Sequence, residues 1–334
     1  MSTHNVFKAL LVEEQDDHTF SKKVVERHIT DLPENDLLID VHYSSLNYKD
    51  AMSARGNKRI SQNFPHTPGI DAAGVVVGDK SGTFSPGEEV LVFGYDLGMN
   101  TAGGFGQFIR VPAAWVIKCP AGLSTRDSMI FGTAGFTAAL CIEKLQVNGV
   151  MPESGPILVT GATGGVGIIA VALLSKLGYE VIASTGKKSA EELLKRLGAD
   201  TIIDRNEINE PSRRPLLKEQ WAGAIDVVGG DTLFSVLKSI KYGGSVACCG
   251  LVQSPMFEAS VFPFILRGVN LLGIDSVELP LEVKRATWEK LADDWGLDTL
   301  DSFATEISLD DVPGCLSLVL AGKATGRYLV NLEK

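Results

Sequence analysis

Residues Ala162, Gly164 and Gly167 form an A-x-G-x-x-G pattern between an apolar strand-like run and an apolar helical stretch. This is the fingerprint of dinucleotide-binding loops, with alanine in its first position, in the context where such loops occur. Gly164 would let the backbone approach a pyrophosphate, and Gly167 would let the helix pack closely on the strand. A ligand-free glycine-rich turn is the alternative, which the strand–helix context disfavours. The residues predicted to contact the phosphates are Thr163, Gly164, Gly165 and Val166.

The stretch beyond this loop predicts which dinucleotide binds. About twenty residues after the glycines, NAD-dependent enzymes place an Asp or Glu that binds the ribose 2′-hydroxyl. Here the sequence reads STGKK, residues 184–188, and has no acid. Hydroxyl and ammonium groups suit a 2′-phosphate, so the sequence predicts NADPH, although a solvated basic turn is the alternative. The predicted ligands of the phosphate end are Ser184, Thr185, Gly186 and Lys187.

Asp71 stands in the stretch HTPGIDAAGVV, residues 66–76, and its carboxylate is a candidate metal ligand, catalytic acid or turn former. A zinc site needs three or four N, S or O ligands. All five histidines lie early in the chain without a nearby cysteine, and Cys119 is the only cysteine between positions 80 and 120. We therefore predict no metal site and a structural role for Asp71, which would satisfy N–H groups of the turn. A proton relay is the alternative.

Two kinds of periodicity divide the chain. Residues up to 126 are rich in alternating strand patterns such as LLIDVHYSS, residues 37–45. From residue 127 the sequence alternates between strand and helix, as in chains that build a parallel sheet, and helices are predicted over 126–145 and 231–244. The tail from 296 to 334 returns to a strand, helix and strand order. We expect one domain of residues 1–126 with 296–334, and a second of residues 127–295.

Composition limits the partners of this chain. It has 334 residues, a net charge of −10 and 45% hydrophobic residues. An acidic chain without Lys/Arg tracts is poorly suited to nucleic acids or anionic membranes. The five cysteines lack the spacing of secreted domains, and the first residues lack a signal-peptide pattern. We expect a soluble cytoplasmic protein that acts on a small molecule, with no nucleic-acid or membrane partner.

Several strings resemble a known family. The overall order of segments is similar to the medium-chain dehydrogenase/reductase superfamily, along nearly the whole chain. SSLNYKDA, PGIDAAGVV, GTAGFTAALC, VTGATGGVG, WAGAIDVVGG and FPFILRGVNLLGIDSV more narrowly resemble the YhdH-type quinone oxidoreductases, also called acrylyl-CoA reductases. The resemblance implies an α/β fold, with a Rossmann doubly wound parallel sheet for NADPH and a β-rich GroES-like catalytic domain. Ile70 stands where zinc-dependent members carry histidine.

The resemblance implies hydride transfer to the conjugated C=C bond of a short enoyl-CoA such as acrylyl-CoA, without a metal. Such a reaction needs donors to the thioester oxygen and a proton for the α-carbon. Asn47 and Tyr48 are the candidate catalytic residues. Tyr48 is also expected to contact the nicotinamide, and a packed aromatic is its alternative role. Gly250 and Arg327 complete the expected cofactor contacts.

A basic loop after the candidate catalytic residues leaves more than one substrate class open. Arg55, Lys58 and Arg59 form a local basic loop that would hold the phosphates of CoA, although an ordinary exposed loop fits equally. If that loop binds nothing, an NADPH:quinone or general enone/enal reductase is the alternative function. A non-catalytic NADPH-binding structural or sensor protein is the alternative of another class. The apolar stretch 269–277 predicts a homodimer joined edge to edge through the Rossmann sheet.

Overall fold

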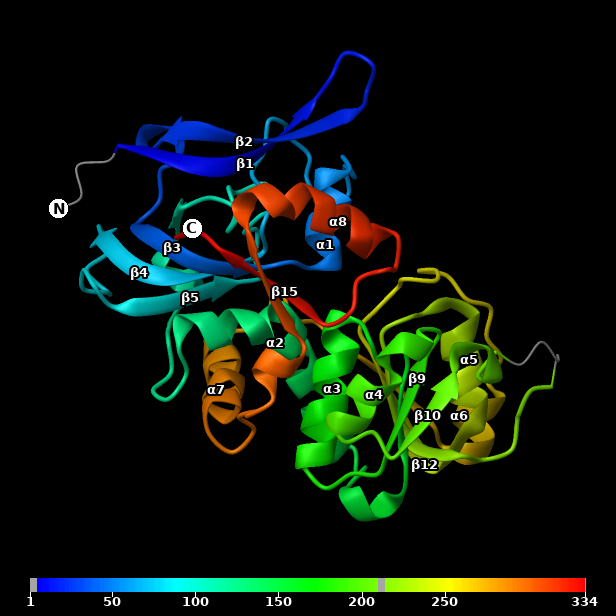
Figure 1. Ribbon diagram of the computed structural model, residues 1–334. Helices are drawn as coiled ribbons and strands as arrows, with labels where there is room; N and C mark the ends of the chain where they lie inside the picture. Colours follow the sequence, from blue (N-terminus) through cyan, green and yellow to red (C-terminus); the bar gives the residue numbers. More distant parts are fainter. Residues whose placement is uncertain (1–4, 210–213, 334) are drawn as a thin grey trace. The chain divides into compact units, whose positions relative to one another are not determined.

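The computed structural model describes residues 5–209 and 214–333, which form two compact units (Figure 1). The first unit contains the chain up to Thr133, Val277–Asp293, and the C-terminal stretch from Ala304. The second unit contains Ala134–Ser276 and Asp294–Phe303. The units differ from the predicted domains chiefly at 277–293, which we expected in the nucleotide-binding domain and which lies in the first unit. The outermost predicted limits, 1 and 334, lie outside the described residues.

The first unit is built on a seven-stranded sheet in the order β14-β15-β3-β4-β5-β7, with β6 paired to β3 beside this path. β15 pairs antiparallel with the end of β3 and parallel with β14, so the tail of the chain completes a sheet begun near its start. These strands are β3 (Leu37–Ser45), β4 (Asp71–Asp79), β5 (Glu89–Phe93), β6 (Phe108–Val111), β7 (Val116–Lys118), β14 (Ala304–Ser308) and β15 (Arg327–Asn331).

A separate hairpin and three whole α-helices of the described residues also belong to the first unit, as does the part of the helix from Thr125 that precedes Ala134. The hairpin consists of β1 (Val6–Glu14) and β2 (Phe20–His28). The helices are α1 (Tyr48–Ala54), α7 (Leu281–Ala292) and α8 (Val312–Leu320), and α1 packs against α8. Ile39 and Val41 of β3 are buried as the alternating pattern predicts, because successive strand side chains point to opposite faces. Both contribute to the apolar core between the sheet and its helices.

The second unit is a parallel sheet of six strands in the order β10-β9-β8-β11-β12-β13. Its inner strands are buried at almost every residue, as expected for a sheet with helices on both faces. The order and direction confirm the predicted Rossmann fold. The elements are β8 (Ile157–Val159), α3 (Gly165–Lys176), β9 (Val181–Thr185), α4 (Glu191–Arg196), β10 (Thr201–Asp204), β11 (Trp221–Asp226), α5 (Gly230–Ser239), β12 (Ile240–Cys248), α6 (Phe262–Arg267) and β13 (Asn270–Gly273).

Two elements differ from the sequence prediction. The helix predicted over 231–244 ends at Ser239, and the residues from Ile240 begin β12. The helix predicted over 126–145 is α2 (Thr125–Val147), but its backbone leaves the helical conformation at Gly132 (φ 51°, ψ −159°). By length and composition α2 could cross a membrane, yet 83% of its apolar window is buried, as in a core helix.

Candidate functional site

The glycine-rich loop of the second unit has the geometry that its sequence predicts. It leaves β8 through Gly161, whose φ of 57° suits glycine, and reaches Gly164, the N-cap of α3. A Cβ at Gly167 would lie 2.4 Å from the carbonyl oxygen of Gly161, so the helix approaches the strand too closely for another side chain. Gly165 and Val166 open the helix, where N–H groups lack intrahelical acceptors. This arrangement can bind a pyrophosphate.

The end of β9 carries the residues predicted for the 2′-phosphate. Ser184 and Thr185 are buried, and the Thr185 hydroxyl accepts the backbone N–H of Lys187 at 3.0 Å. Thr185 Oγ1 also lies 3.3 Å from the hydroxyl oxygen of Thr163 in the phosphate loop. Burial lowers the pKa of Lys187, and the charge of Arg205 lowers it further. The contact between the hydroxyls of Thr163 and Thr185 therefore links the phosphate loop to the end of β9.

Arg205 is a candidate ligand that the sequence prediction missed. It follows the end of β10, and its side chain lies over Gly186, where a Cβ would come within 2.7 Å of Arg205 Nε. Two cations, Lys187 and Arg205, thus stand close together at the carboxyl edge of the sheet, where ligands of such sheets bind. An anion between them would relieve their repulsion. The sequence feature that could have identified Arg205 is its position directly after the strand TIID.

Gly250 lies where the loops after β11 and β12 meet. A Cβ at Gly250 would be 2.0 Å from the carbonyl oxygen of Val227, so close packing of the two loops requires glycine here. Asp226 holds this edge together, since its carboxylate accepts the Thr160 hydroxyl and the Gly229 N–H, both at 2.7 Å. The predicted nicotinamide contact of Gly250 remains a prediction, and loop packing is a sufficient reason for the glycine.

In the first unit, Asn47 and Tyr48 stand at the start of α1. Asn47 is the N-cap, and its backbone N–H donates to the carboxylate of Asp50 in a capping box. The Asn47 amide donates to Asp71 Oδ2 at 2.8 Å and to the Ser45 carbonyl at 3.3 Å. Its oxygen accepts from Arg327 at 3.4 Å. Because both amide hydrogens are engaged, Asn47 orients the turn rather than offering a free donor.

Tyr48 differs from Asn47 in whether its side-chain hydrogen-bond donor is engaged. It is the first residue of α1 and is half-buried. Its hydroxyl makes no hydrogen bond with the residues that the structure describes, so it is available to a ligand.

Asp71 is the centre of a buried hydrogen-bond network. Its Oδ2 accepts the Ser45 hydroxyl at 2.6 Å and the Thr133 N–H at 2.9 Å, in addition to Asn47. Its Oδ1 accepts the Thr133 hydroxyl at 2.5 Å. Since Thr133 follows the break at Gly132, Asp71 caps the helical turns that begin there. This capping role accounts for the burial of the Asp71 carboxylate at the start of β4.

These contacts do not fit a zinc site. The acceptor positions of Asp71 are engaged by protein donors, and its neighbour Ile70 offers no ligand. Within residues 5–209 and 214–333, no group of three or more His, Cys, Asp or Glu side chains is arranged to hold a metal ion.

Arg327, predicted to contact the cofactor, is 2% exposed at the start of β15. Its guanidinium donates to the carbonyl oxygens of Ile130 and Leu46 and to the Ser45 hydroxyl, at 2.8–3.0 Å. Burial lowers the pKa of Arg327, while the charges of Asp71 and Asp50 raise it. The structure therefore brings Asn47, Asp71 and Arg327 into one network, with Arg327 as an internal counter-charge. Contact with a cofactor remains a prediction.

The predicted CoA-binding loop is less basic than its sequence suggests. Arg55, Lys58 and Arg59 are all exposed after α1. Lys58, however, pairs with Glu14 Oε2 at 2.7 Å and lies over the rings of Phe64 and Phe20. Arg55 and Arg59 are thus the cations of this loop that remain candidates for a phosphate.

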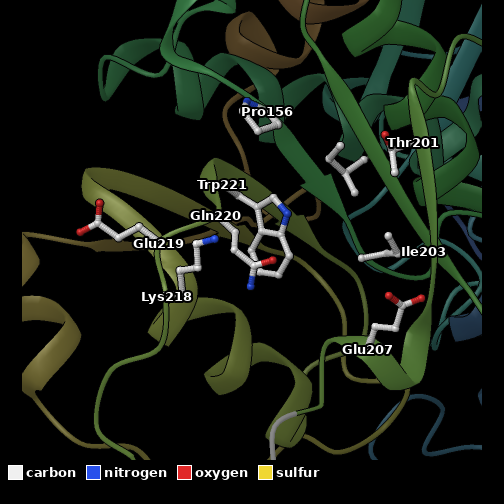
Figure 2. A pocket seen from close by; sticks show the side chains of 9 residues that line it. Pro156, Thr201, Ile203, Glu207, Lys218, Glu219, Gln220 and Trp221 are labelled. Atoms are coloured by element: carbon white, nitrogen blue, oxygen red, sulfur yellow. The ribbon is translucent and has the colours of Figure 1, made fainter.

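A surface hollow lies on the second unit. It has a volume of about 430 Å³, and Figure 2 shows the Trp221 indole among its lining side chains. Pro156, Thr201 and Trp221 stand at or just before the first residues of β8, β10 and β11. Much of the lining therefore comes from the amino ends of the strands, although Ile203 and Glu207 extend it to the carboxyl end of β10. We do not assign it to the reaction.

Comparison with known proteins agrees with this geometry. Residues 33–121 match the alcohol dehydrogenase GroES-like domain, and residues 165–294 match the family described as zinc-binding dehydrogenase. The putative quinone oxidoreductase YhfP of Bacillus subtilis (strain 168) is 45% identical over 99% of this chain and 100% of the relative. The probable acrylyl-CoA reductase AcuI of Escherichia coli (strain K12) is 46% identical over 98% and 100%.

Solved structures extend the comparison to bound cofactors. The structure of E. coli K-12 YHDH with bound NADPH has a TM-score of 0.94 and 46% identity, over 97% of this chain and 99% of that one. The structure of B. subtilis yhfP with NAD bound has a TM-score of 0.95 and 44% identity, over 98% and 100%. Full-length identity at this level establishes kinship: the chain belongs to the medium-chain dehydrogenase/reductase superfamily, as an oxidoreductase of the group that includes YhfP, YhdH and AcuI.

Proposed function

We propose that the protein uses NADPH to reduce the C=C bond conjugated to the thioester carbonyl of a short enoyl-CoA, such as acrylyl-CoA, without a metal. The E. coli relative named as a probable acrylyl-CoA reductase supports this substrate class. The structural observation that carries the proposal is Tyr48, whose hydroxyl makes no hydrogen bond with the described part of the chain and which stands on a helix start fixed by buried charges. The proposed location is the cytoplasm.

The second unit supplies the residues that fit NADPH. Gly165 and Val166 offer backbone N–H groups at the start of α3 for the pyrophosphate, while the N–H of Gly164 donates to the Gly161 carbonyl at 2.9 Å within the loop. Lys187 and Arg205 offer paired cations for the 2′-phosphate, beside the hydroxyl groups of Ser184 and Thr185. When bound, NADPH supplies the hydride.

The first unit supplies the groups that handle charge on the substrate. Hydride addition to the β-carbon places negative charge on the thioester oxygen, which then needs a hydrogen-bond donor. The Tyr48 hydroxyl is the candidate donor, to that oxygen or to the nicotinamide amide. Asn47 and Arg327 hold the backbone of the turn in place. The α-carbon takes its proton from Tyr48 or from water.

One observation favours the alternative, an NADPH:quinone or general enone/enal reductase. The ion pair between Lys58 and Glu14 reduces the positive charge of the loop that would bind CoA. A small quinone needs no phosphate clamp, and the B. subtilis relative is named as a putative quinone oxidoreductase. The two functions therefore differ in what they require of Arg55 and Arg59.

A substrate screen tests the proposal. The purified chain is assayed for NADPH oxidation with acrylyl-CoA, crotonyl-CoA, free acrolein and a benzoquinone. We expect the highest kcat/KM with an enoyl-CoA, and a lower value for that substrate alone in an Arg55→Ala, Arg59→Ala variant. Turnover of benzoquinone above that of both thioesters, unaffected by the double substitution, would assign the alternative function.

A further inference from the structure

Asp50 is a fully buried carboxylate that joins two segments of the first unit. It lies in the first turn of α1 and is 0% exposed. Its Oδ2 accepts the backbone N–H of Asn47 at 2.8 Å, within the same turn. Its Oδ1 accepts the backbone N–H of Ile70 at 2.9 Å, directly before β4. One side chain thereby fixes the start of α1 to the start of β4.

The surroundings of Asp50 destabilise the ionised form of its carboxyl group. The charged groups that act on it from the packed elements are Asp71 at the start of β4 and Arg327 on β15. Helix α8, which also packs on α1, carries Cys315 as its titratable side chain. Burial raises the pKa of Asp50 to about 7, and the charge of Asp71 contributes to the increase. A group that titrates near neutrality therefore lies two residues from Tyr48.

We propose that Asp50 is a positioning residue for Tyr48, because its carboxylate anchors the turn that carries Tyr48 to the loop before β4. The proposal rests on the role given to Tyr48 in the proposed function. The ionised carboxylate makes two charge-assisted bonds to backbone N–H groups, which are stronger than neutral ones. Protonation weakens both bonds, so the turn, and Tyr48 with it, is held less firmly. Asp50 itself exchanges no proton with the substrate.

This role gives activity and stability opposite dependences on pH. Activity requires the ionised form, so kcat should fall as pH decreases through about 7. For stability, the folded pKa lies above the unfolded value, which is near the ordinary 3.8. The contribution of Asp50 to the unfolding free energy is therefore fully present below the unfolded pKa and is lost as pH rises through the folded pKa. A residue that only stabilised the fold would change both quantities in the same direction.

The test compares Asp50→Asn with Asp79→Asn in the full chain. Asparagine keeps the shape of Asp50 but turns an NH₂ group towards one of the two backbone donors. Asp79 is the matched control, because its carboxylate also accepts several backbone N–H groups but lies at the far, only partly buried end of β4. We expect Asp50→Asn to lower kcat about tenfold or more, by the loss of a charge-assisted bond, and to raise the Kd for NADPH no more than Tyr48→Phe does. Its kcat should no longer vary between about pH 6 and pH 8.

A double-mutant cycle with Tyr48→Phe separates positioning from general damage. If Asp50 acts through Tyr48, the double variant should lose little more than Tyr48→Phe alone. The proposal is overturned if the kcat losses of the two single variants multiply in the double variant. It is also overturned if Asp50→Asn keeps the wild-type kcat and pH profile.

Amide hydrogen exchange provides a readout that needs no turnover. The peptides that contain Asn47 and Ile70 should exchange faster in Asp50→Asn than in Asp79→Asn, at equal global stability. In the wild-type chain the same peptides should become less protected below about pH 7. If no alkene is reduced but exchange changes as expected, the proposed function fails and the anchoring role stands. Unchanged exchange at both sites refutes the anchoring role, whether or not the enzyme is active.

Discussion

The carboxylate of Asp71 accepts two hydrogen bonds from Thr133, one from its backbone N–H and one from its hydroxyl. The two residues are 62 positions apart in the chain and meet because α2 breaks at Gly132. The break frees the Thr133 N–H from the helical ladder and directs it to a buried anion. Asp71 is thus an internal N-cap, and the same carboxylate orients Asn47 beside Tyr48.

Gly132→Ala should destabilise the protein by about 3 kcal/mol, because it combines backbone strain with a clash in a buried network. The position has a φ of 51°, and a Cβ would lie 2.5 Å from Asp71 Oδ2 and 2.6 Å from Ser45 Oγ. Gly78→Ala in β4 is the control, since nothing lies within 4 Å of its Cβ. We expect the control to change the unfolding free energy by less than about 1 kcal/mol in urea titrations. Equal effects of the two substitutions would contradict this account.

Much of the second unit could be predicted from sequence because its signals are local. The alternation of strand and helix patterns and the loop around Gly164 each lie within a short window. The boundary at Ile240 was wrong because the apolar pattern continues to Tyr242 and ends at two glycines, which commonly follow a helix, whereas Ile240 already pairs with Trp221 of β11 and pairing resumes at Ser245. Tertiary pairing outweighs local propensity at such positions.

The network of the first unit could not be predicted in the same way. The partners of Asp71 come from β3, the turn before α1, and α2, and Arg327 joins them from the last strand. No spacing in the chain links these residues, since the sheet pairing of β15 with β3 brings them together. The structural role expected for Asp71 agrees with its contacts, but the identity of the donors needed the fold.

Cofactor preference should depend on Lys187 and Arg205. A charge-assisted hydrogen bond is worth roughly 1.5–3 kcal/mol, so Lys187→Ala or Arg205→Ala should weaken NADPH binding about tenfold to a hundredfold. NADH affinity should barely change, because the 2′-hydroxyl offers no charge to either residue. Lys195→Ala is the control, because this exposed lysine of α4 pairs with Glu192 at 3.3 Å and is not among the predicted ligands. Kd values from nucleotide fluorescence titration check the prediction, and equal losses for NADPH and NADH would show an effect on folding.

We also expect a homodimer joined through the edge of the parallel sheet. β13 is the last strand in the sheet order, and within the described residues it pairs only with β12. Leu271 on β13 is 38% exposed, and Ile265 on the preceding helix α6 is 69% exposed. An unpaired apolar edge is an aggregation hazard unless something covers it, and a second copy would do so.

Light scattering tests the dimer with Leu271→Lys, which places a charge on the proposed interface. We expect twice the chain mass for the wild type and a lower mass for the variant at the same concentration. Val77→Lys is the control, because Val77 is a similarly exposed apolar strand residue in the first unit. A wild-type chain that scatters as a monomer excludes the dimer.

Tyr48→Phe should distinguish proton donation from positioning. If the Tyr48 hydroxyl donates the α-proton, its removal should lower kcat by about 10²–10⁴-fold, the usual range for a general acid. NADPH affinity should then be kept, because the ring is retained. If the hydroxyl only positions the nicotinamide amide, the loss should be about tenfold, the value of one neutral hydrogen bond, and the Kd for NADPH should rise as well.

The fate of solvent deuterium provides an independent check of the same residue. With water as the proton source, the product formed in D₂O should carry deuterium at the α-carbon without stereochemical control, in wild type and variant alike. With Tyr48 as the donor, the wild-type product should carry deuterium on one face and the variant on both. We expect positioning, because the Tyr48 hydroxyl makes no hydrogen bond within residues 5–209 and 214–333 through which a donated proton could be replaced. Wild-type values of both kcat and Kd in Tyr48→Phe would remove Tyr48 from the mechanism.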